Sequence, residues 1–131
     1  MEIKRSVLRL IVSDFRRSYR FYRDTVGLSL DFGTEDDAVA EFDGETVLLT
    51  IVDKEQIELI PAGIYTTAGR GSGDRSVLVF TVPDLGAACK QLAEKGVKLL
   101  SEPIAVSEWQ IRVAYFRDPD GNLIEIQELA A

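Results

Sequence analysis

One pattern occurs twice in this chain of 131 residues, and it restricts the possible folds more than any other feature. The segments LRLIVSDFRRSYRFYRDTVGLSL and VLVFTVPDLGAACKQLAEKGVKLL each read as a strand, an aspartate, a helix and a glycine. Aspartate is a common helix N-cap, and glycine commonly ends a helix. Asp14 and Asp84, 70 residues apart, are the expected caps, and Gly27 and Gly96 are the expected ends. The repetition predicts two similar structural modules.

Further strand patterns follow each helix and complete the modules. The first half continues with LSLDFG and AVAEFDGETVLLTIVD, and the second with VKLLSEP, WQIRVAYF and NLIEIQEL. We therefore expect an α+β fold made of two tandem βαβββ modules within one domain, 1–131. The first module is residues 1–60 and the second is residues 77–131. Between them, the glycine-containing segment 61–76 is expected to be a linker or a lid.

The chain contains no histidine, which excludes several kinds of site. A catalytic triad with histidine, a zinc site of the histidine type and an iron site with two histidines all need this residue. Its single cysteine, Cys89, cannot form an intrachain disulfide, which favours a reducing, cytoplasmic location. No apolar run is long enough to span a membrane, and the N-terminus lacks a signal-peptide pattern.

The net charge of −7 argues against general affinity for nucleic acid, which requires clustered cations. Arg16, Arg20 and Arg23 do share one side of the first predicted helix, but such a stripe is typical of a solvated helix face. We therefore expect neither nucleic acid nor membrane among the partners.

The stretches LRLIVSDFRRSYRFYRDTVGL and FRDPDGNLIEI, with the repeated modules, resemble the vicinal oxygen chelate superfamily. This superfamily includes glyoxalases, bleomycin-resistance proteins and extradiol dioxygenases. The resemblance implies the glyoxalase/bleomycin-resistance fold, in which the modules curl mixed sheets into a cup around a small-molecule site. It also implies a homodimer.

The resemblance further implies where metal ligands would lie, one on each of four strands. The corresponding positions are Val7, Leu48, Val77 and Glu125, of which Glu125 alone has a metal-binding side chain. A divalent transition metal normally needs three or four protein ligands. We therefore expect no metal and no other cofactor, which disfavours the metal-dependent activities of the superfamily.

Alternation along the strands predicts which side chains line the cup. If Glu125 faces inward, the resemblance places Tyr115 beside it. Alternate residues of the other strands are expected to face inward in the same way. The expected ligand-binding residues are Arg9, Ile11, Phe42, Leu48, Val77, Val79, Trp109, Ile111, Val113, Tyr115 and Glu125. This lining is mostly apolar and aromatic, so an aromatic or cationic small molecule is the expected ligand. Trp109 has a second interpretation, as a residue that packs in a dimer interface.

A buried Glu125 without a metal needs another partner for its charge. Arg9 is the first candidate, and Arg112 is less favoured because of the strand alternation. A cationic or hydrogen-bonding ligand is the alternative, and an internal pair of glutamate and arginine would need no ligand at all.

Three functions fit these observations, and binding without turnover is favoured. The first is a metal-independent binding protein that sequesters a natural product or an antibiotic one-for-one, as metal-free members resembling this chain do. The second is a metal-free or weakly metal-dependent lyase or isomerase of the glyoxalase type, with Glu125 as its candidate catalytic residue. The third is a regulatory or immunity-type partner whose cup is filled by side chains.

Overall fold

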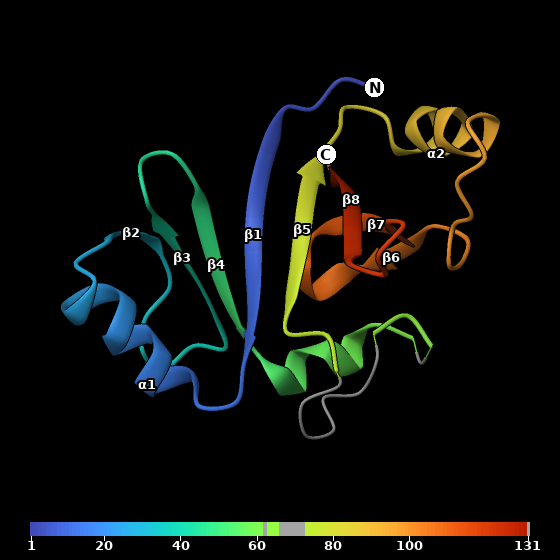
Figure 1. Cartoon of the computed structure of the whole chain (residues 1–131). Helices are drawn as coiled ribbons and strands as arrows, with labels where there is room; N and C mark the ends of the chain where they lie inside the picture. The colour runs from blue at the N-terminus through green and yellow to red at the C-terminus, as the bar shows by residue number, and fades with distance from the viewer. Residues whose placement is uncertain (62, 66–72, 131) are drawn as a thin grey trace.

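A computed structural model describes residues 1–61, 63–65 and 73–130. In this part of the chain, eight strands form one mixed sheet in the order β2-β3-β4-β1-β5-β8-β7-β6. The strands are β1 (Arg5–Val12), β2 (Ser29–Phe32), β3 (Val39–Asp43), β4 (Leu48–Asp53), β5 (Ser76–Thr81), β6 (Ile104–Val106), β7 (Ile111–Arg117) and β8 (Leu123–Leu129). The predicted α+β fold of the glyoxalase/bleomycin-resistance type is confirmed (Figure 1).

The two halves of the chain meet at the centre of the sheet. Strand β1 pairs with β4 in parallel and with β5 in antiparallel orientation, and β5 pairs with β8 in parallel. The pairing of β1 with β5 makes the sheet continuous, with four strands on either side of it. Residues 62 and 66–72 of the predicted linker lie outside the described residues. The role of 61–76 and the module boundaries beside it stay predictions.

The two principal helices begin where the sequence predicts. Asp14 caps α1 (Phe15–Arg20) by accepting a hydrogen bond from the backbone N–H of Arg17, and Asp84 caps α2 (Leu85–Glu94) in the same way. The first helix differs from expectation after Arg20, because it continues as a π-helical turn, η1 (Phe21–Thr25). Two short 3₁₀ helices, η2 (Lys54–Leu59) and η3 (Ser107–Trp109), follow β4 and β6. None of the helices in the described part of the chain is long and apolar enough to cross a membrane.

Each principal helix covers one half of the outer face of the sheet (Figure 1). Under α1, the buried cluster contains Phe15, Tyr19, Ala40, Phe42, Leu49 and Ile51. Under α2, it contains Val82, Leu85, Ala88, Ala114 and Ile126. Burial of one large apolar side chain contributes about 1.5–3 kcal/mol, so these clusters hold the helices on the sheet.

Phe42 therefore lies on the outer face, and its predicted place in the lining of the cup is wrong. Its ring is fully buried and packs against the rings of Tyr19 and Tyr22. Because side chains alternate along β3, the preceding residue, Glu41, faces inward instead.

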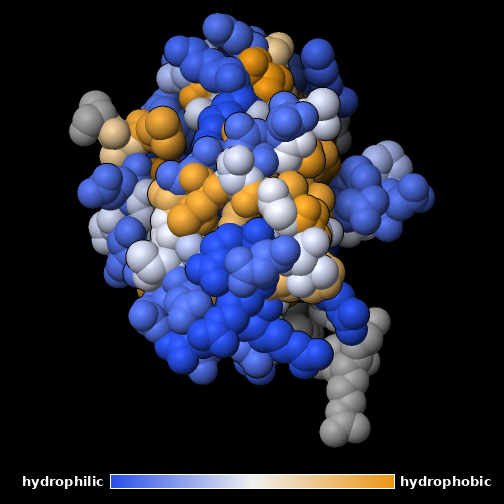
Figure 2. All heavy atoms as spheres, turned by 90° about the vertical axis from the view of Figure 1, so that its left-hand side faces the viewer, coloured by the Kyte–Doolittle hydropathy of each residue, from blue (hydrophilic) through white to orange (hydrophobic). Residues whose placement is uncertain are grey.

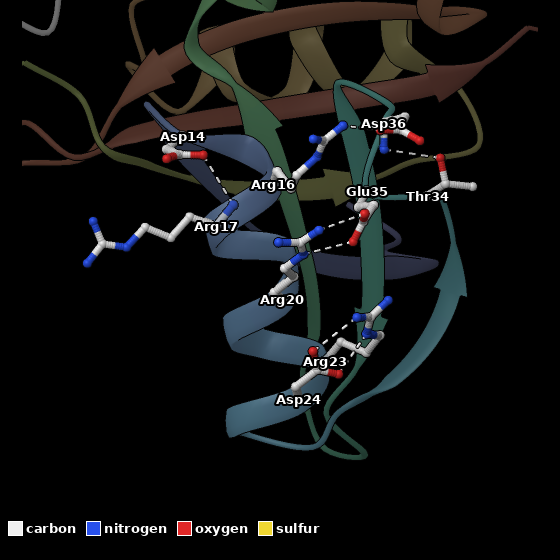
Figure 3. A network of polar contacts seen from close by, with 9 residues as sticks. All are labelled: Asp14, Arg16, Arg17, Arg20, Arg23, Asp24, Thr34, Glu35 and Asp36. Atoms are coloured by element: carbon white, nitrogen blue, oxygen red, sulfur yellow. Dashed lines mark hydrogen bonds and ion pairs between the residues drawn. The ribbon is translucent and has the colours of Figure 1, made fainter.

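The arginines of the first helix face solvent, as the sequence predicts. Arg20 donates two hydrogen bonds of 2.9 Å to Glu35, and Arg23 forms an ion pair with the neighbouring Asp24 (Figure 3). Arg16 pairs with Asp36 in the loop after β2. Exposed pairs of this kind contribute little to stability, because water and salt screen the charges.

Candidate functional site

The inner face of the sheet carries a cleft of about 330 Å³. Its walls come from seven strands and from η3. The lining residues are Arg5, Val7, Arg9, Phe32, Val39, Glu41, Thr50, Val52, Val79, Glu108, Trp109, Ile111, Gln127 and Leu129. The lining thus combines an apolar majority with a few charged or hydrogen-bonding groups, which is typical of a small-molecule site.

A buried ion pair lies at the inner face, where strand pairing brings β1, β5, β8 and β7 together. Val79 is opposite Glu125, and Glu125 is opposite Tyr115. The Nη1 and Nη2 atoms of Arg9 lie 2.7 and 3.2 Å from the two carboxylate oxygens of Glu125. The Tyr115 hydroxyl donates a third hydrogen bond, of 2.6 Å, to Oε1 of Glu125. Glu125 is fully buried, so its charge depends on these partners.

Aromatic side chains enclose the guanidinium of Arg9. Its Cζ atom lies 5.1 Å from the centroid of the Trp109 ring, which is cation–π geometry. Nη1 also approaches the hydroxyl oxygen of Tyr65 at 3.5 Å, and the Tyr65 ring packs edge-on against Tyr115. The indole N–H of Trp109 is buried and has no hydrogen-bond acceptor among the described residues.

The buried environment changes the proton affinity of this cluster. Burial alone would lower the pKa of Arg9, but the charge and hydrogen bonds of Glu125 more than offset it, so the pKa is raised. Burial, with the Glu125 charge, raises the pKa of Tyr65 to about 12 and raises that of Tyr115 as well. Both hydroxyls therefore stay protonated at neutral pH, and neither serves as a base.

Glu41 is a second inward carboxylate, which the sequence analysis did not identify. It lies on β3 opposite Thr50 and is 4% exposed. Its oxygens accept hydrogen bonds from Arg5 and from the Thr50 hydroxyl, the latter at 3.4 Å. Burial raises the pKa of Glu41, an effect that Arg5 only partly opposes. Strand alternation is the signal in the sequence that could identify it. The aromatic ring of Phe42 suits the face covered by a helix, so the preceding residue, Glu41, must point to the opposite, inner face.

The predicted lining residues fall into three groups. Arg9, Val79, Trp109 and Ile111 line the cleft. A second group lies in or against the buried cluster of the inner face or bonds to it: Ile11, Leu48, Val77, Val113, Tyr115 and Glu125. Phe42 alone lies on the outer face. The pattern did not identify Arg5, Glu41 or Thr50 as lining residues.

Comparison with known proteins identifies the family. The model of the glyoxalase/bleomycin resistance protein/dioxygenase superfamily matches residues 5–126, which is nearly the whole chain. The chain belongs to this superfamily. Its members bind small molecules on the fold described above.

Individual relatives of the superfamily are similar over most of this chain. It is 37% identical over 123 residues to the uncharacterized protein YraH of Bacillus subtilis (strain 168), covering 93% of this chain and 95% of that protein. Catechol-2,3-dioxygenase of the same strain is 30% identical over 118 residues, and the match spans 90% of this chain but 39% of the enzyme. The crystal structure of methylmalonyl-CoA epimerase from Mycobacterium tuberculosis has a TM-score of 0.67 at 19% identity, covering 98% of this chain and 90% of that chain. The last similarity shows the fold alone.

The residues at the superfamily's expected metal positions do not fit a divalent cation. Val7, Leu48 and Val77 have no ligand atoms in their side chains, and the described residues contain no group of three or more potential acidic or thiol ligands. Both oxygens of Glu125 already accept hydrogen bonds from Arg9. The positive charge beside Glu125 is therefore supplied by a guanidinium.

Proposed function

We propose that this protein binds a small organic molecule in the cleft without a metal ion and without consuming it. The observation that carries this proposal is the cleft itself, about 330 Å³ between walls of paired strands. Apolar side chains such as Val7, Val52 and Ile111 supply surface for burial, and a few polar groups fix orientation. Because the walls belong to one continuous sheet, little ordering is needed on binding.

The arginines of the cleft do not require an anionic ligand. Arg5 is paired with Glu41, and Arg9 is paired with Glu125, so each cation is compensated. The cation beside Trp109 is the protein's own Arg9. A planar, largely neutral molecule would bury its rings against the apolar wall, and its polar atoms would meet the paired groups. Sequestration of a natural product or antibiotic, one molecule per chain, is the form of this function that we propose.

Native mass spectrometry of gently purified protein tests the proposal. We expect one organic mass per chain, which is lost on denaturation and recovered unchanged in the extract. Incubation of the extracted compound with fresh protein should restore the complex and leave the compound intact. Release of a chemically altered compound would contradict binding without turnover.

A second candidate function is proton transfer, and Glu41 is the observation that favours it. A general acid or base works best when its pKa approaches the working pH, and burial raises the pKa of Glu41 within the cleft. Glu125 is less suited, because three hydrogen bonds from Arg9 and Tyr115 hold its oxygens. By contrast, Glu41 lines the cleft and accepts one hydrogen bond from Arg5 and a longer one, of 3.4 Å, from Thr50. The fold is shared with methylmalonyl-CoA epimerase, so an isomerase is compatible with it.

Hydrogen exchange distinguishes this candidate from simple binding. The bound compound would be incubated with the protein in deuterated water and examined for deuterium at carbon. Glu41→Gln should abolish any incorporation while the compound still binds, if Glu41 moves the proton. Equal incorporation by the wild type and by this variant would exclude Glu41 as the acid or base.

A further inference from the structure

We propose that Arg9 is the group that binds an oxygen atom of the ligand. Its guanidinium, held in place by Glu125, would donate its remaining N–H groups to a carbonyl or carboxylate oxygen of an aromatic molecule. This inference rests on the proposed binding function and specifies the chemistry of the same cleft.

The hydrogen-bond inventory of Arg9 leaves donors available. A guanidinium carries five N–H donors and no acceptor. Among the described residues, Glu125 accepts two of these hydrogens and Tyr65 accepts a third, over 3.5 Å. The Nε–H and one hydrogen of Nη2 therefore have no acceptor in this part of the chain. Arg9 also lines the cleft, and its side chain is 11% exposed, so a ligand can reach it.

The same contacts make the guanidinium a fixed donor. Glu125 holds it through two hydrogen bonds and is itself fixed by the Tyr115 hydroxyl, while the Cζ atom of Arg9 lies over the Trp109 ring. A donor that is already ordered loses little side-chain entropy when a ligand binds. Because Glu125 compensates the charge, the ligand oxygen does not need to be anionic. Both a neutral carbonyl and a carboxylate can accept these hydrogen bonds.

Trp109 provides an independent observation that points to a ligand acceptor. Its indole N–H is buried without an acceptor among the described residues, which costs about 1–3 kcal/mol. The ring lies beside Arg9 and lines the same cleft. A ligand that carries an oxygen acceptor next to an aromatic ring would meet the Arg9 donors and the apolar wall beside Trp109, and a small shift of the indole would let its N–H share that acceptor.

Arg9 thus supplies the positive charge that a metal ion would supply, because the residues at the expected metal positions cannot hold such an ion. Val7 and Val77 lie on the two central strands beside it, where Arg9 is opposite Val77 and Val7 is opposite Val79. The positive charge in the cleft is thus carried by an arginine side chain and not by a bound ion. Recognition of the ligand oxygen would then proceed through hydrogen bonds from a guanidinium.

Calorimetric titration of the full chain with four small probes tests the inference. Benzoate and benzamide carry an oxygen acceptor on an aromatic ring, whereas aniline and benzylamine carry none. The test variant is Arg9→Gln with Glu125→Gln, which removes both charges together and leaves amides that can pair. The matched control is Arg20→Gln with Glu35→Gln, an exposed pair on the first helix and the loop after β2 (Figure 3).

We expect benzoate or benzamide to bind the wild type and the control equally and to lose about 10-fold or more in affinity for the test variant. Affinity for aniline should stay the same in all three proteins. Circular dichroism would verify the fold. If the double variant does not fold, Arg9→Lys replaces it, because lysine keeps the charge and lacks the planar fork.

Two contrary results would have different meanings. Equal affinity of the test variant and the wild type for the oxygen-bearing probes would overturn the role of Arg9 and leave the binding cleft in place. Binding of none of the four probes to the wild type would overturn both the oxygen site and the proposed cleft for aromatic molecules.

Discussion

At the scale of single residues, the chain depends on a buried ion pair joining its two ends. Arg9 and Glu125 are 116 positions apart in sequence and bond through both oxygens of the carboxylate. Removal of two charges from water is costly, and a buried pair often stabilises a fold no better than apolar residues would. Loss of one partner is worse, because it leaves the other charge buried and uncompensated.

Glu125→Gln should therefore destabilise the protein by about 3–5 kcal/mol, since Arg9 loses its counterion. Adding Arg9→Gln to this variant should recover part of the loss. Urea unfolding followed by circular dichroism measures each free energy. Glu35→Gln, which affects an exposed pair, is the control and should cost far less than Glu125→Gln. A double variant less stable than Glu125→Gln would contradict the argument.

The stability contributed by Glu41 should depend on pH in the direction opposite to that of Glu35. Burial raises the pKa of Glu41 in the folded state, so the folded protein binds this proton more tightly and its ionisation at higher pH weakens the fold. The hydrogen bond from Arg20 lowers the pKa of Glu35, which therefore stabilises the fold at higher pH. Relative to wild type, the melting temperature of Glu41→Gln should rise as the pH increases above the ordinary glutamate pKa of 4.5, and that of Glu35→Gln should fall as the pH increases toward 4.5 from below. The same trend for both variants would contradict these assignments.

At the scale of elements, the connection from β2 to β3 depends on Gly33. Its φ of 99° suits glycine, and an added Cβ would lie 2.7 Å from the backbone oxygen of Val39 and 2.8 Å from the Cα of Ala40. Gly27, with a φ of 81°, has nothing within 4 Å of the same position. The two glycines both have a positive φ but differ in the space beside them.

Gly27→Ala should cost about 1–2 kcal/mol, from backbone conformation alone. Gly33→Ala should cost a further amount of about 1–3 kcal/mol, because the methyl group collides with the neighbouring strand. Thermal unfolding of both variants provides the comparison. Equal losses would show that the β2–β3 connection moves to accept the methyl group.

The sequence predicts elements well where one local signal determines them. The caps Asp14 and Asp84 are examples, because an aspartate before an apolar helix pattern is sufficient evidence. Strand β3 shows the limit. Alternation separates Glu41 from Phe42, but which of them faces inward depends on pairing with β4 and on coverage by α1. The sequence gives Arg9 as the first candidate partner of Glu125, because a buried carboxylate needs a cation, and the two side chains do form an ion pair. The π-helical turn of η1 gives no comparable signal.

At the scale of the whole molecule, the poor fit of Val7, Leu48 and Val77 to a divalent cation leads to a prediction about stability. A ligand that binds the folded state alone raises the melting temperature by mass action. We expect no change in melting temperature when EDTA is added to the protein, nor when Mn²⁺ or Ni²⁺ is supplied afterwards. Arg9 occupies both oxygens of Glu125, and Val7, Leu48 and Val77 cannot replace them. A saturable rise with either ion would contradict this interpretation.

The hydrophobic surface beside β2 suggests where a second copy of the chain would pack. Seen from the side of α1 and β2, a hydrophobic band crosses the molecule between hydrophilic areas (Figure 2). All four residues of the edge strand β2 are exposed, including Leu30 at 42% and Phe32 at 51%. An exposed strand edge with apolar side chains is a natural interface for another protein.

The predicted homodimer can be tested together with this interface. Light scattering during size-exclusion chromatography should give twice the chain mass of 14.5 kDa for the wild type. Leu30→Lys should shift the protein toward monomer, because burial of an unpaired ammonium group in the interface is costly. Leu78→Lys is the matched control, since Leu78 is 40% exposed on β5, which β3, β4 and β1 separate from β2. A monomeric wild type would refute the dimer, whereas dissociation by Leu78→Lys and not by Leu30→Lys would move the interface away from β2.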